Sequence, residues 1–371
     1  MKYYLIAGEA SGDLHGANLM KAIRKNDPEA QFRFWGGDKM QAVGGELVKH
    51  YRDLAFMGFV EVLKNIFTIR KNFALCKKEL RRYVPDVVIF IDYPGFNLRM
   101  AKFAHKMGLK TVFYISPTVW AWKTSRVRIV KKYVDRMMVI LPFEKEFYAR
   151  YDYPVDFVGH PLLDELQEEK VVSREAFLKH NGLPDWPLVA LLPGSREQEI
   201  SKILPEMQRV AEDFPDFQFV VAGVKSVSRQ VYAGFHLPVV YDATHALLRN
   251  ARAALVASGT ATLETALFGV PQVVGYKING LTYVIAQKLV HVKYISLVNL
   301  ILDREVVKEL IQKDYTKEKI SQELRELLYN EQRRKQLSDA YVLLKKKLGS
   351  GGASQRAAAV IAEVAGGINS K

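Results

Sequence analysis

The sequence GEASGD near the N-terminus combines features of two different kinds of binding site. Gly8 and Gly12 allow a backbone to approach a ligand closely, as in loops that bind phosphate. Glu9 and Asp13 bring negative charge into the same loop, where it would repel an anion. Carboxylates accept hydrogen bonds, so the loop also suits hydroxyl groups, with Ser11 as a further polar contact. Whether this loop binds phosphate or hydroxyl groups therefore depends on whether another loop of the chain binds the anion.

The second half of the chain contains a loop that suits an anion better. In LLPGSR, Gly194 and Ser195 can turn backbone N–H groups toward a phosphate, and Arg196 adds a forked positive charge. An ordinary strand-to-helix turn with a solvated arginine would have the same sequence. This motif alone leaves both interpretations open.

A second anion-binding loop is predicted in ASGTATLE. Ser258, Gly259 and Thr260 would begin a helix whose free N–H groups and dipole favour a diphosphate. Glu264 follows one turn later, where its carboxylate can accept hydrogen bonds from two ribose hydroxyls. A plain capped helix is the alternative, but two such loops argue against it. With the diphosphate bound here, the carboxylates of GEASGD are interpreted as acceptors for sugar hydroxyls.

Asp92 stands at the end of the apolar run VVIFID, shortly before Pro94. A carboxylate in this place can remove a proton from a hydroxyl as a general base, or it can cap the next helix. The position at a strand end alone favours the cap.

Trp120 and Trp122 lie in SPTVWAW, a polar loop after the next apolar run. Their indole rings could form a flat wall for a sugar or an acyl chain, or they could anchor the loop itself. His160, in FVGHPL, lies near the expected domain boundary, where a lone histidine is usually structural.

Residues 56–82 mix phenylalanines and aliphatic residues with many lysines and arginines. Such a basic amphipathic surface suits a membrane rich in anionic lipid, although a core-packing helix with a solvated basic face is commoner. The segment resembles no base-stacking module, which argues against nucleic acid. The expected membrane contacts are Phe56, Phe59, Leu63, Lys64, Ile66, Phe67, Arg70 and Lys71.

Short apolar runs rich in Val and Ile precede these loops and alternate with helical patterns along the chain. This alternation predicts an α/β fold with buried parallel strands, whose carboxyl ends collect ligands. The pattern restarts at Leu188 after a polar stretch, so we predict two doubly wound, Rossmann-like domains, residues 1–165 and 166–347. A short helix in residues 348–371 would cap the second domain or cross back to the first.

Composition narrows the function classes. Of the 371 residues, 54 are Lys or Arg and 40 are Asp or Glu, and the net charge of +14 favours polyanionic partners. The single cysteine, Cys76, excludes an internal disulfide and predicts a reducing compartment. Met1 leads directly into YYLIAGEA without a signal peptide, and no apolar run reaches about 18 residues, so we expect a cytoplasmic protein.

Several common motifs are missing from the sequence. It contains no Walker A sequence, no GxGxxG and no HExxH, which disfavours ATP binding, dinucleotide binding and zinc-protease chemistry. No Asp-x-Asp pair or Cys/His cluster offers ligands for a metal ion. We therefore expect no metal and no cofactor.

Taken together, the motifs resemble those of the lipid-A-disaccharide synthase family, in the same order and over nearly the whole chain. The matching sequences are GEASGD, FMGFVEV, IDYPGFN, SPTVWAW, LPFE, FVGHPL, LLPGSR, ASGTATLE and VNLILDREVVKELIQ. The resemblance implies a GT-B fold, in which two Rossmann-like domains face each other across a cleft, and catalysis without a metal. It also implies inverting transfer of 2,3-diacylglucosamine from its UDP derivative to 2,3-diacylglucosamine 1-phosphate (lipid X), which forms the β-1,6-linked disaccharide.

The resemblance also implies roles for individual residues. Asp92 becomes the expected catalytic base, with Glu9 or Asp13 as the next candidates, and the GEASGD loop, Asn97 and the two tryptophans fall on the acceptor side. The UDP-sugar side contains Gly194, Ser195, Arg196, Ser258, Gly259, Thr260, Glu264, Asn299, Glu305 and Gln312. The chain departs from the family at Gly95, usually acidic, and at Val298, usually proline.

The expected partners are UDP-diacylglucosamine, lipid X and the anionic cytoplasmic face of the inner membrane, with the protein peripherally attached. Nucleic acid is not expected, and a homodimer stays open. One alternative is another GT-B enzyme that acts on UDP-N-acetylglucosamine, such as a 2-epimerase or a transferase with a soluble acceptor. Such an enzyme would give no reason for the basic aromatic segment. A non-catalytic protein that binds nucleic acid or membrane is the other alternative, and it would not bind UDP.

Overall fold

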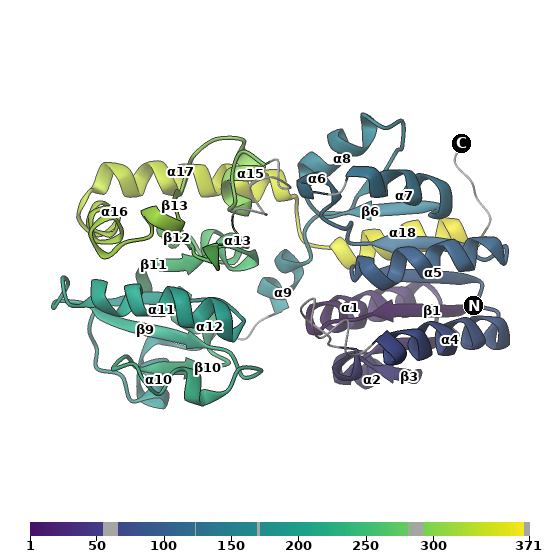
Figure 1. The fold of residues 1–371 in the computed structure, drawn as a ribbon, viewed down its shortest axis with the longest axis horizontal. Coiled ribbons are helices and arrows are strands. Elements are labelled where there is room, and N and C mark those ends of the chain that lie inside the picture. The colour runs from purple at the N-terminus through teal and green to yellow at the C-terminus, as the bar shows by residue number, and fades with distance from the viewer. Residues whose placement is uncertain (55–65, 123, 169–170, 281–282, 284–291, 367–371) are drawn as a thin grey trace. The chain divides into compact units, whose positions relative to one another are not determined.

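The computed structural model describes residues 1–54, 66–122, 124–168, 171–280, 283 and 292–366 (Figure 1). The chain divides into two compact units. One unit consists of Met1–Glu168 together with Leu348–Lys371, and the other is Glu169–Lys347. The predicted boundary at residue 165 lies close to this division, and the C-terminal segment groups with the first unit.

The first unit contains a seven-stranded parallel sheet in the order β3-β2-β1-β4-β5-β6-β7. Its strands are β1 Lys2–Ala7, β2 Gln31–Gly36, β3 Glu46–His50, β4 Val87–Ile91, β5 Lys110–Tyr114, β6 Arg136–Val139 and β7 Asp156–Phe157. Strand β4 (VVIFI) is buried along its whole length, because helices cover both faces of the sheet. Ala7 pairs with Ile91, and Ile91 pairs with Tyr114, so β1, β4 and β5 end side by side.

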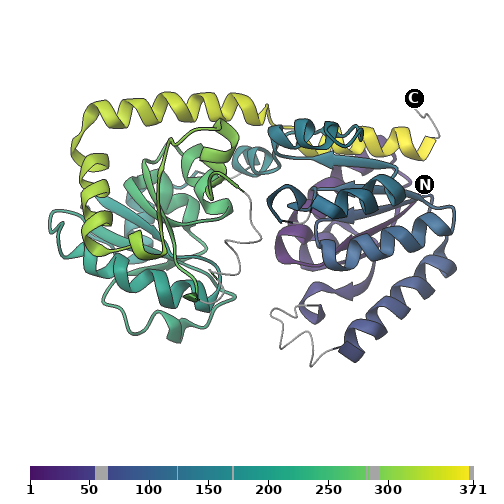
Figure 2. The same cartoon turned by 45° about the horizontal axis from the view of Figure 1, so that its top comes forward.

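Two sets of helices cover this sheet, and the alternation along β1 shows both. Tyr3, Leu5 and Ala7 pack in a core cluster with α1 and α18, whereas Tyr4 and Ile6 pack in a second cluster with α4 and α5. The helix α18 lies beside α1 (Figure 2). The helices of the unit are α1 Ala10–Asn26, α2 Asp38–Val43, α4 Ile66–Tyr83, α5 Pro94–Lys106, α6 Val119–Trp122, α7 Val127–Tyr133, α8 Pro142–Ala149, α9 Leu162–Glu168 and α18 Ala353–Gly366, with 3-10 turns at Tyr51–Asp53 and Thr124–Arg126.

The second unit repeats the design with a six-stranded parallel sheet in the order β10-β9-β8-β11-β12-β13. Its strands are β8 Leu188–Leu192, β9 Gln218–Gly223, β10 Val239–Tyr241, β11 Ala251–Ala257, β12 Gln272–Tyr276 and β13 Lys308–Ile311. Its helices are α10 Arg174–Asn181, α11 Glu197–Ala211, α12 Thr244–Asn250, α13 Thr260–Leu267, α15 Leu297–Leu302, α16 Lys317–Tyr329 and α17 Glu331–Leu348, with 3-10 turns at Arg229–Val231 and Gln312–Asp314. Val256 pairs with Leu192, which sets the loops after β8 and β11 side by side.

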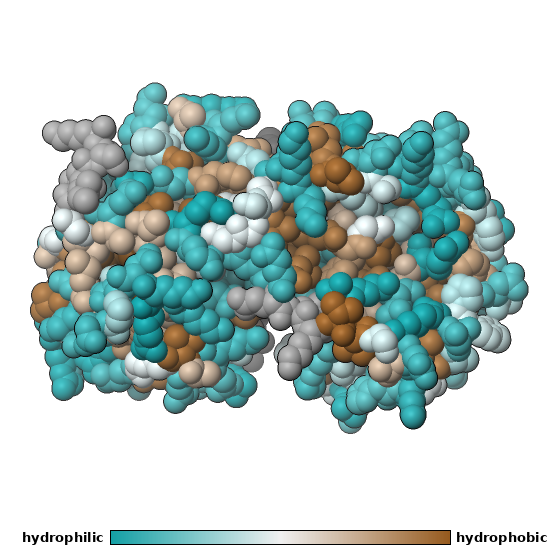
Figure 3. Space-filling model, turned by 180° about the vertical axis from the view of Figure 1, so that it is seen from behind, coloured by the Kyte–Doolittle hydropathy of each residue, from teal (hydrophilic) through white to brown (hydrophobic). Residues whose placement is uncertain are grey.

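Both sheets reverse their strand order at the first strand of the unit, as doubly wound Rossmann-like sheets do. The predicted fold class, two Rossmann-like α/β domains, is therefore confirmed. In the face drawn in Figure 3, polar residues cover most of the surface and apolar side chains are exposed in small separate groups. Among the described residues, no helix combines the length and the apolar character that a membrane crossing needs.

Candidate active site

Asp92 immediately follows β4, where the backbone takes a strained course. Asp92 and Tyr93 have left-handed φ angles of 44° and 48°, which residues with side chains rarely adopt. Asn97 stabilises this course, because its buried Nδ2 donates to the carbonyl oxygens of Asp92 (2.7 Å), Ile91 (3.3 Å) and Ile6 (3.2 Å). The amide nitrogen of Asn97 therefore supports these strand ends, and the contact of Asn97 with the acceptor stays a prediction.

The carboxyl group of Asp92 is a stronger base than an ordinary aspartate. Burial, reinforced by the negative charge of Glu9, raises the pKa of Asp92 to about 6, although the backbone N–H of Tyr93 and the nearby His15 act in the opposite direction. The group is therefore ionised at neutral pH and still basic enough to accept a proton from a substrate hydroxyl. His15 itself lies 3.3 Å from Glu165 of α9, so charged groups gather at this edge of the sheet.

The two carboxylates of GEASGD have different environments. Glu9 is exposed at the N-cap of α1, next to the exposed Ser11. Asp13 is only 2% exposed, and its oxygens accept hydrogen bonds from the backbone N–H groups of Gly37 (2.7 Å), Lys39 (3.0 Å) and Met40 (3.1 Å). These bonds occupy both oxygens at the start of α2. Asp13 therefore has a structural role at the start of α2, and its contact with a sugar hydroxyl and its candidacy as the base stay predictions.

The glycines of GEASGD allow neighbouring protein groups to pack closely against the backbone. A Cβ atom on Gly8 would lie 2.3 Å from the ring of Tyr93, and one on Gly12 would lie 3.2 Å from the Cβ of Ala7. Protein atoms fill the space beside Gly8 that a side chain would need, and the close approach of a ligand to this glycine stays a prediction.

The aromatic loop after β5 is anchored by α8. Trp120 is half-buried and meets Phe143 edge to face, with ring centroids 4.9 Å apart. Glu144 is buried and accepts from the backbone N–H groups of Leu141 (3.0 Å) and Ile140 (3.3 Å). Burial raises the pKa of Glu144 to about 7, despite these bonds and the nearby Ser116 and Trp120 side chains. The side chain of Trp122 lies outside the described part.

The buried capping role of Glu144 was not predicted, although the motif LPFE contains the signal for it. A glutamate at the third position of a helix typically reaches back to the preceding backbone N–H groups. His160 is structural, as predicted: its Nδ1 accepts from the backbone of Leu162 at 3.2 Å, and burial, with a contribution from His15, lowers its pKa to about 3.

The second unit contains a cavity of about 440 Å³ at the carboxyl ends of β8, β9 and β11. Its lining includes seven of the predicted UDP-sugar residues, namely Gly194, Ser195, Arg196, Ser258, Gly259, Thr260 and Glu264. The loop after β8 is held by Glu199, which accepts from the backbone N–H of Ser195 and from Nη1 of Arg196, both at 3.2 Å. Gly194 has a φ of 117°, and a Cβ on it would lie 2.7 Å from the Glu199 carboxylate. A side chain at position 194 would therefore displace the acid that orders this loop.

Glu264 is oriented by a residue that the sequence did not single out. Nε2 of His245, on α12, lies 2.6 Å from Oε1 of Glu264 on α13. Both side chains are about a quarter exposed or less. The hydroxyl of Ser258 donates a hydrogen bond to the backbone carbonyl of Ile295 at 2.9 Å.

Three other predicted UDP-sugar residues do not line this cavity. Asn299 is buried and uses its amide on Val306, Val307 and Glu309. Gln312 exchanges two hydrogen bonds with the backbone of Ile278, at 2.9 and 3.2 Å.

Glu305 is the third predicted UDP-sugar residue that does not line the cavity. Its side chain is exposed and forms an ion pair with Lys308 at 3.0 Å. Protein groups occupy the side chains of Asn299 and Gln312, and the nucleotide contact of these two residues stays a prediction. Nothing in the structure directs Glu305 toward the cavity.

The predicted membrane contacts are only partly visible. Phe56, Phe59, Leu63 and Lys64 lie outside the described residues, as does the side chain of Ile66. At the start of α4, Phe67 is 71% exposed, and Arg70 and Lys71 are exposed as well. Exposure of a phenylalanine beside two cations is what a membrane contact would need, and the contact itself stays a prediction.

Solved structures define the class of fold. The UDP-GlcNAc 2-epimerase from Neisseria meningitidis, solved with UDP-GlcNAc bound, superimposes with a TM-score of 0.70 at 12% identity and covers 98% of this chain and 100% of its own. The calicheamicin glycosyltransferase superimposes with a TM-score of 0.60 at 16% identity and covers 99% of each chain. The chain therefore has the GT-B fold that glycosyltransferases and UDP-GlcNAc 2-epimerases share.

Sequence comparisons define the family. The model of the lipid-A-disaccharide synthetase family matches residues 3–364. The lipid-A-disaccharide synthase of Geobacter sulfurreducens is 38% identical over 98% of this chain and 97% of its own length. That of Coxiella burnetii is 40% identical over 96% of each, and that of Syntrophus aciditrophicus is 41% identical over 95% of each. The chain belongs to the lipid-A-disaccharide synthase family, which confirms the predicted family and the predicted glycosyltransferase class.

Proposed function

We propose that the protein transfers 2,3-diacylglucosamine from its UDP derivative to the 6-hydroxyl of lipid X, with inversion, forming the β-1,6-linked disaccharide 1-phosphate and UDP. The observation that carries this proposal is Asp92, a basic carboxylate at the carboxyl end of strand β4 in the first unit. The cavity around Arg196 and Glu264 in the second unit supplies the matching nucleotide site. Family membership supports the choice of the two lipid substrates.

In the proposed reaction, Asp92 removes the proton from the acceptor hydroxyl while that oxygen attacks C1 of the donor sugar. The bond from C1 to the UDP oxygen breaks on the opposite face, and the electron pair leaves with UDP. Negative charge grows on the diphosphate, where Arg196 and the N-terminus of α13 can stabilise it. Glu264 is proposed to accept hydrogen bonds from the ribose hydroxyls, with His245 holding its other oxygen.

We infer that these protein groups replace a metal ion on the diphosphate. In the described part of the chain, no group of three or more His, Cys, Asp or Glu side chains could hold a metal ion. Unchanged turnover in the presence of a chelator would support this inference, and restoration of lost turnover by added divalent ions would contradict it.

We also propose that the protein works at the cytoplasmic face of the inner membrane, with Phe67, Arg70 and Lys71 in contact with anionic lipid. Vesicle sedimentation tests this: binding should require anionic lipid and weaken as salt is raised. Equal binding to neutral vesicles at high salt would remove the electrostatic part of the proposal.

The reaction is tested directly by incubating the protein with the UDP-linked diacyl sugar and lipid X. Mass spectrometry should detect the disaccharide 1-phosphate, and UDP should appear in equal amount. Conversion of UDP-N-acetylglucosamine to its 2-epimer, with no disaccharide formed, would instead support the function of the structural neighbours.

A further inference from the structure

A groove of about 520 Å³ lies between α4 and α5 in the first unit. Three of its cations come from one face of α4, since Arg70, Lys77 and Arg81 recur at helical spacing. Arg99, from α5, faces them across the groove. Apart from these four cations, Phe73 and Ala74 are the only described residues that line the groove, so the described part of its walls contains no negative charge.

Aromatic rings hold the cations in place. The guanidinium of Arg99 lies 5.5 Å from the centroid of Phe73, and Lys77 and Arg81 lie 5.4 and 5.1 Å from that of Phe103. Among the described residues, none of the four groove cations has a carboxylate partner. Aromatic rings thus order three of the four groove cations. The four positive charges repel one another, and a bound anion would relieve that repulsion.

A further arginine adds to the charge at this place. Arg126, in the 3-10 turn before α7, has a pKa lowered by burial and by the positive charge of Arg99. The two guanidinium groups are therefore close enough to interact. Guanidinium groups present forked donors that match phosphate oxygens.

A row of aromatic rings links the groove to the candidate base. Tyr93, the residue after Asp92, lies 5.8 Å from Phe96 between ring centroids, and Phe96 stacks on Phe73 at 4.5 Å. Phe73 is the ring that carries Arg99. The groove and Asp92 thus belong to the same side of the first unit, where α4 and α5 pack against each other (Figure 2).

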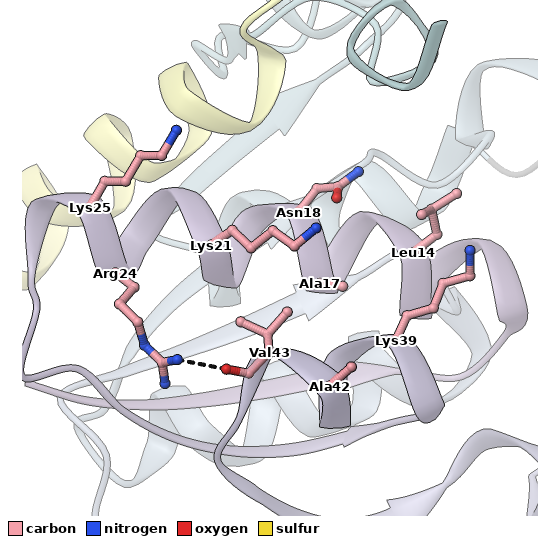
Figure 4. Close-up of a pocket in the computed structure, with 9 residues that line it drawn as sticks. All are labelled: Leu14, Ala17, Asn18, Lys21, Arg24, Lys25, Lys39, Ala42 and Val43. Carbon is pink, nitrogen blue, oxygen red and sulfur yellow. Dashed lines mark hydrogen bonds between the residues drawn. The ribbon is translucent and has the colours of Figure 1, made fainter. Parts of the chain in front are cut away.

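A second basic groove, between α1 and α2, fits less well. Its cations are Lys21, Arg24, Lys25 and Lys39, and Figure 4 shows that Arg24 already donates to the carbonyl of Val43, at 2.6 Å. The helix α1 packs on the opposite face of the sheet from α4 and α5, so this groove has no comparable aromatic link to Asp92.

We propose that the groove between α4 and α5 binds the phosphate monoester of the acceptor lipid. This inference rests on the proposed function, whose acceptor carries a 1-phosphate while the donor sugar does not. A phosphate monoester brings a charge of roughly −1.5 to −2 at neutral pH, which complements the uncompensated cations. Phe67, exposed one turn before Arg70 on α4, adds apolar surface for an acyl chain next to that phosphate.

The test compares two acceptors with two variants. Kinetics are measured in detergent micelles with lipid X and with 2,3-diacylglucosamine that lacks the phosphate. Arg99→Ala should raise KM for lipid X by about tenfold or more, because a charged hydrogen bond is lost, and should leave KM for the phosphate-free acceptor unchanged. Arg99→Lys should recover part of the loss. Lys102→Ala removes the same charge from the same helix outside the groove and should behave as the unaltered protein.

Other results would overturn the inference in separate ways. An equal loss with both acceptors would mean that Arg99 does not recognise the phosphate. Unchanged kinetics in micelles, together with weaker binding to anionic vesicles, would assign the groove to membrane phospholipid instead. If the unaltered protein forms no disaccharide with either acceptor, the proposed function itself fails, which distinguishes that failure from a failure of the groove assignment.

Discussion

The two units have the same strand order, yet their equivalent loops have opposite chemistry. The loop after β1 contains the carboxylate of Glu9, and the loop after β8 contains Arg196. The loop after β4 contains Asp92, and the loop after β11 begins a helix whose dipole favours an anion. The fold therefore supplies two similar frames, and function lies in which side chains stand at the strand ends.

The comparison also separates two ways of preparing a carboxylate. Asp92 is made basic by burial and by the neighbouring charge of Glu9. Glu264 stands beside the imidazole of His245, whose Nε2 lies 2.6 Å from its Oε1. The first arrangement suits a group that accepts a proton, and the second suits a group that must stay in position as an acceptor.

The largest expected effect belongs to Asp92. Asp92→Asn should lower kcat by a factor on the order of 100 or more, because the amide cannot accept the proton. Asparagine tolerates left-handed backbone angles, so the loop geometry should persist. Steady-state kinetics and thermal melting measure the two effects, and near-normal turnover in a folded variant would exclude Asp92 as the base.

The raised pKa of Asp92 gives a pH dependence. The carboxylate must be ionised to act as a base, so kcat/KM should fall about tenfold per pH unit below pH 6 and level off above it. A profile of initial rates between pH 4.5 and pH 8 would show the bend. An inflection near pH 4, the ordinary aspartate range, would contradict the burial argument.

The nucleotide cavity should respond through binding affinity. Arg196→Ala and Glu264→Ala should each weaken UDP binding by about tenfold, the usual cost of a charged hydrogen bond. Two variants outside the cavity are matched controls. Arg209→Ala removes a positive charge from α11, the helix that follows Arg196, and Glu305→Ala removes an exposed negative charge. Isothermal calorimetry measures all four, and unchanged affinity in both cavity variants would place the nucleotide elsewhere.

His245 should have a smaller effect, since it acts through Glu264. His245→Ala should weaken UDP binding by about threefold to tenfold, and His245→Gln, whose amide can still donate to the carboxylate, should recover part of that loss. Binding of a UDP analogue without ribose hydroxyls should be equal in the unaltered protein and both variants. A loss that extends to this analogue would indicate a general structural role.

The fold followed from the sequence because buried parallel strands have a distinctive composition. Runs such as VVIFI and LVALL are apolar on both sides, and their spacing revealed the restart of the pattern. Seven residues singled out from the sequence line one cavity of the second unit, because glycines, small hydroxyl residues and helix starts have local signals. Their contact with UDP stays a prediction.

The sequence does not reveal the direction in which a polar side chain points. Asp13, Asn97, Asn299 and Gln312 stand in motifs that suggested ligands, and in the structure each binds backbone groups brought near by the fold. His245 was missed for the related reason that its contact joins two helices. The contact of Glu199 with the backbone N–H of Ser195, in contrast, could have been predicted from the sequence. A glutamate at the third position of a helix typically accepts hydrogen bonds from the backbone before the helix.

Asp13 offers the last contrast, with a large effect on stability and the smallest on catalysis. Asp13→Asn turns an amide group toward three backbone N–H donors, and losing at least one hydrogen bond there should cost about 1–3 kcal/mol of unfolding free energy. Glu9→Gln, at an exposed position, should leave stability nearly unchanged. Urea denaturation and acceptor KM would be measured for both. A large rise in KM for Asp13→Asn without loss of stability would place Asp13 in the acceptor site, because only a residue in contact with the substrate would show that pattern.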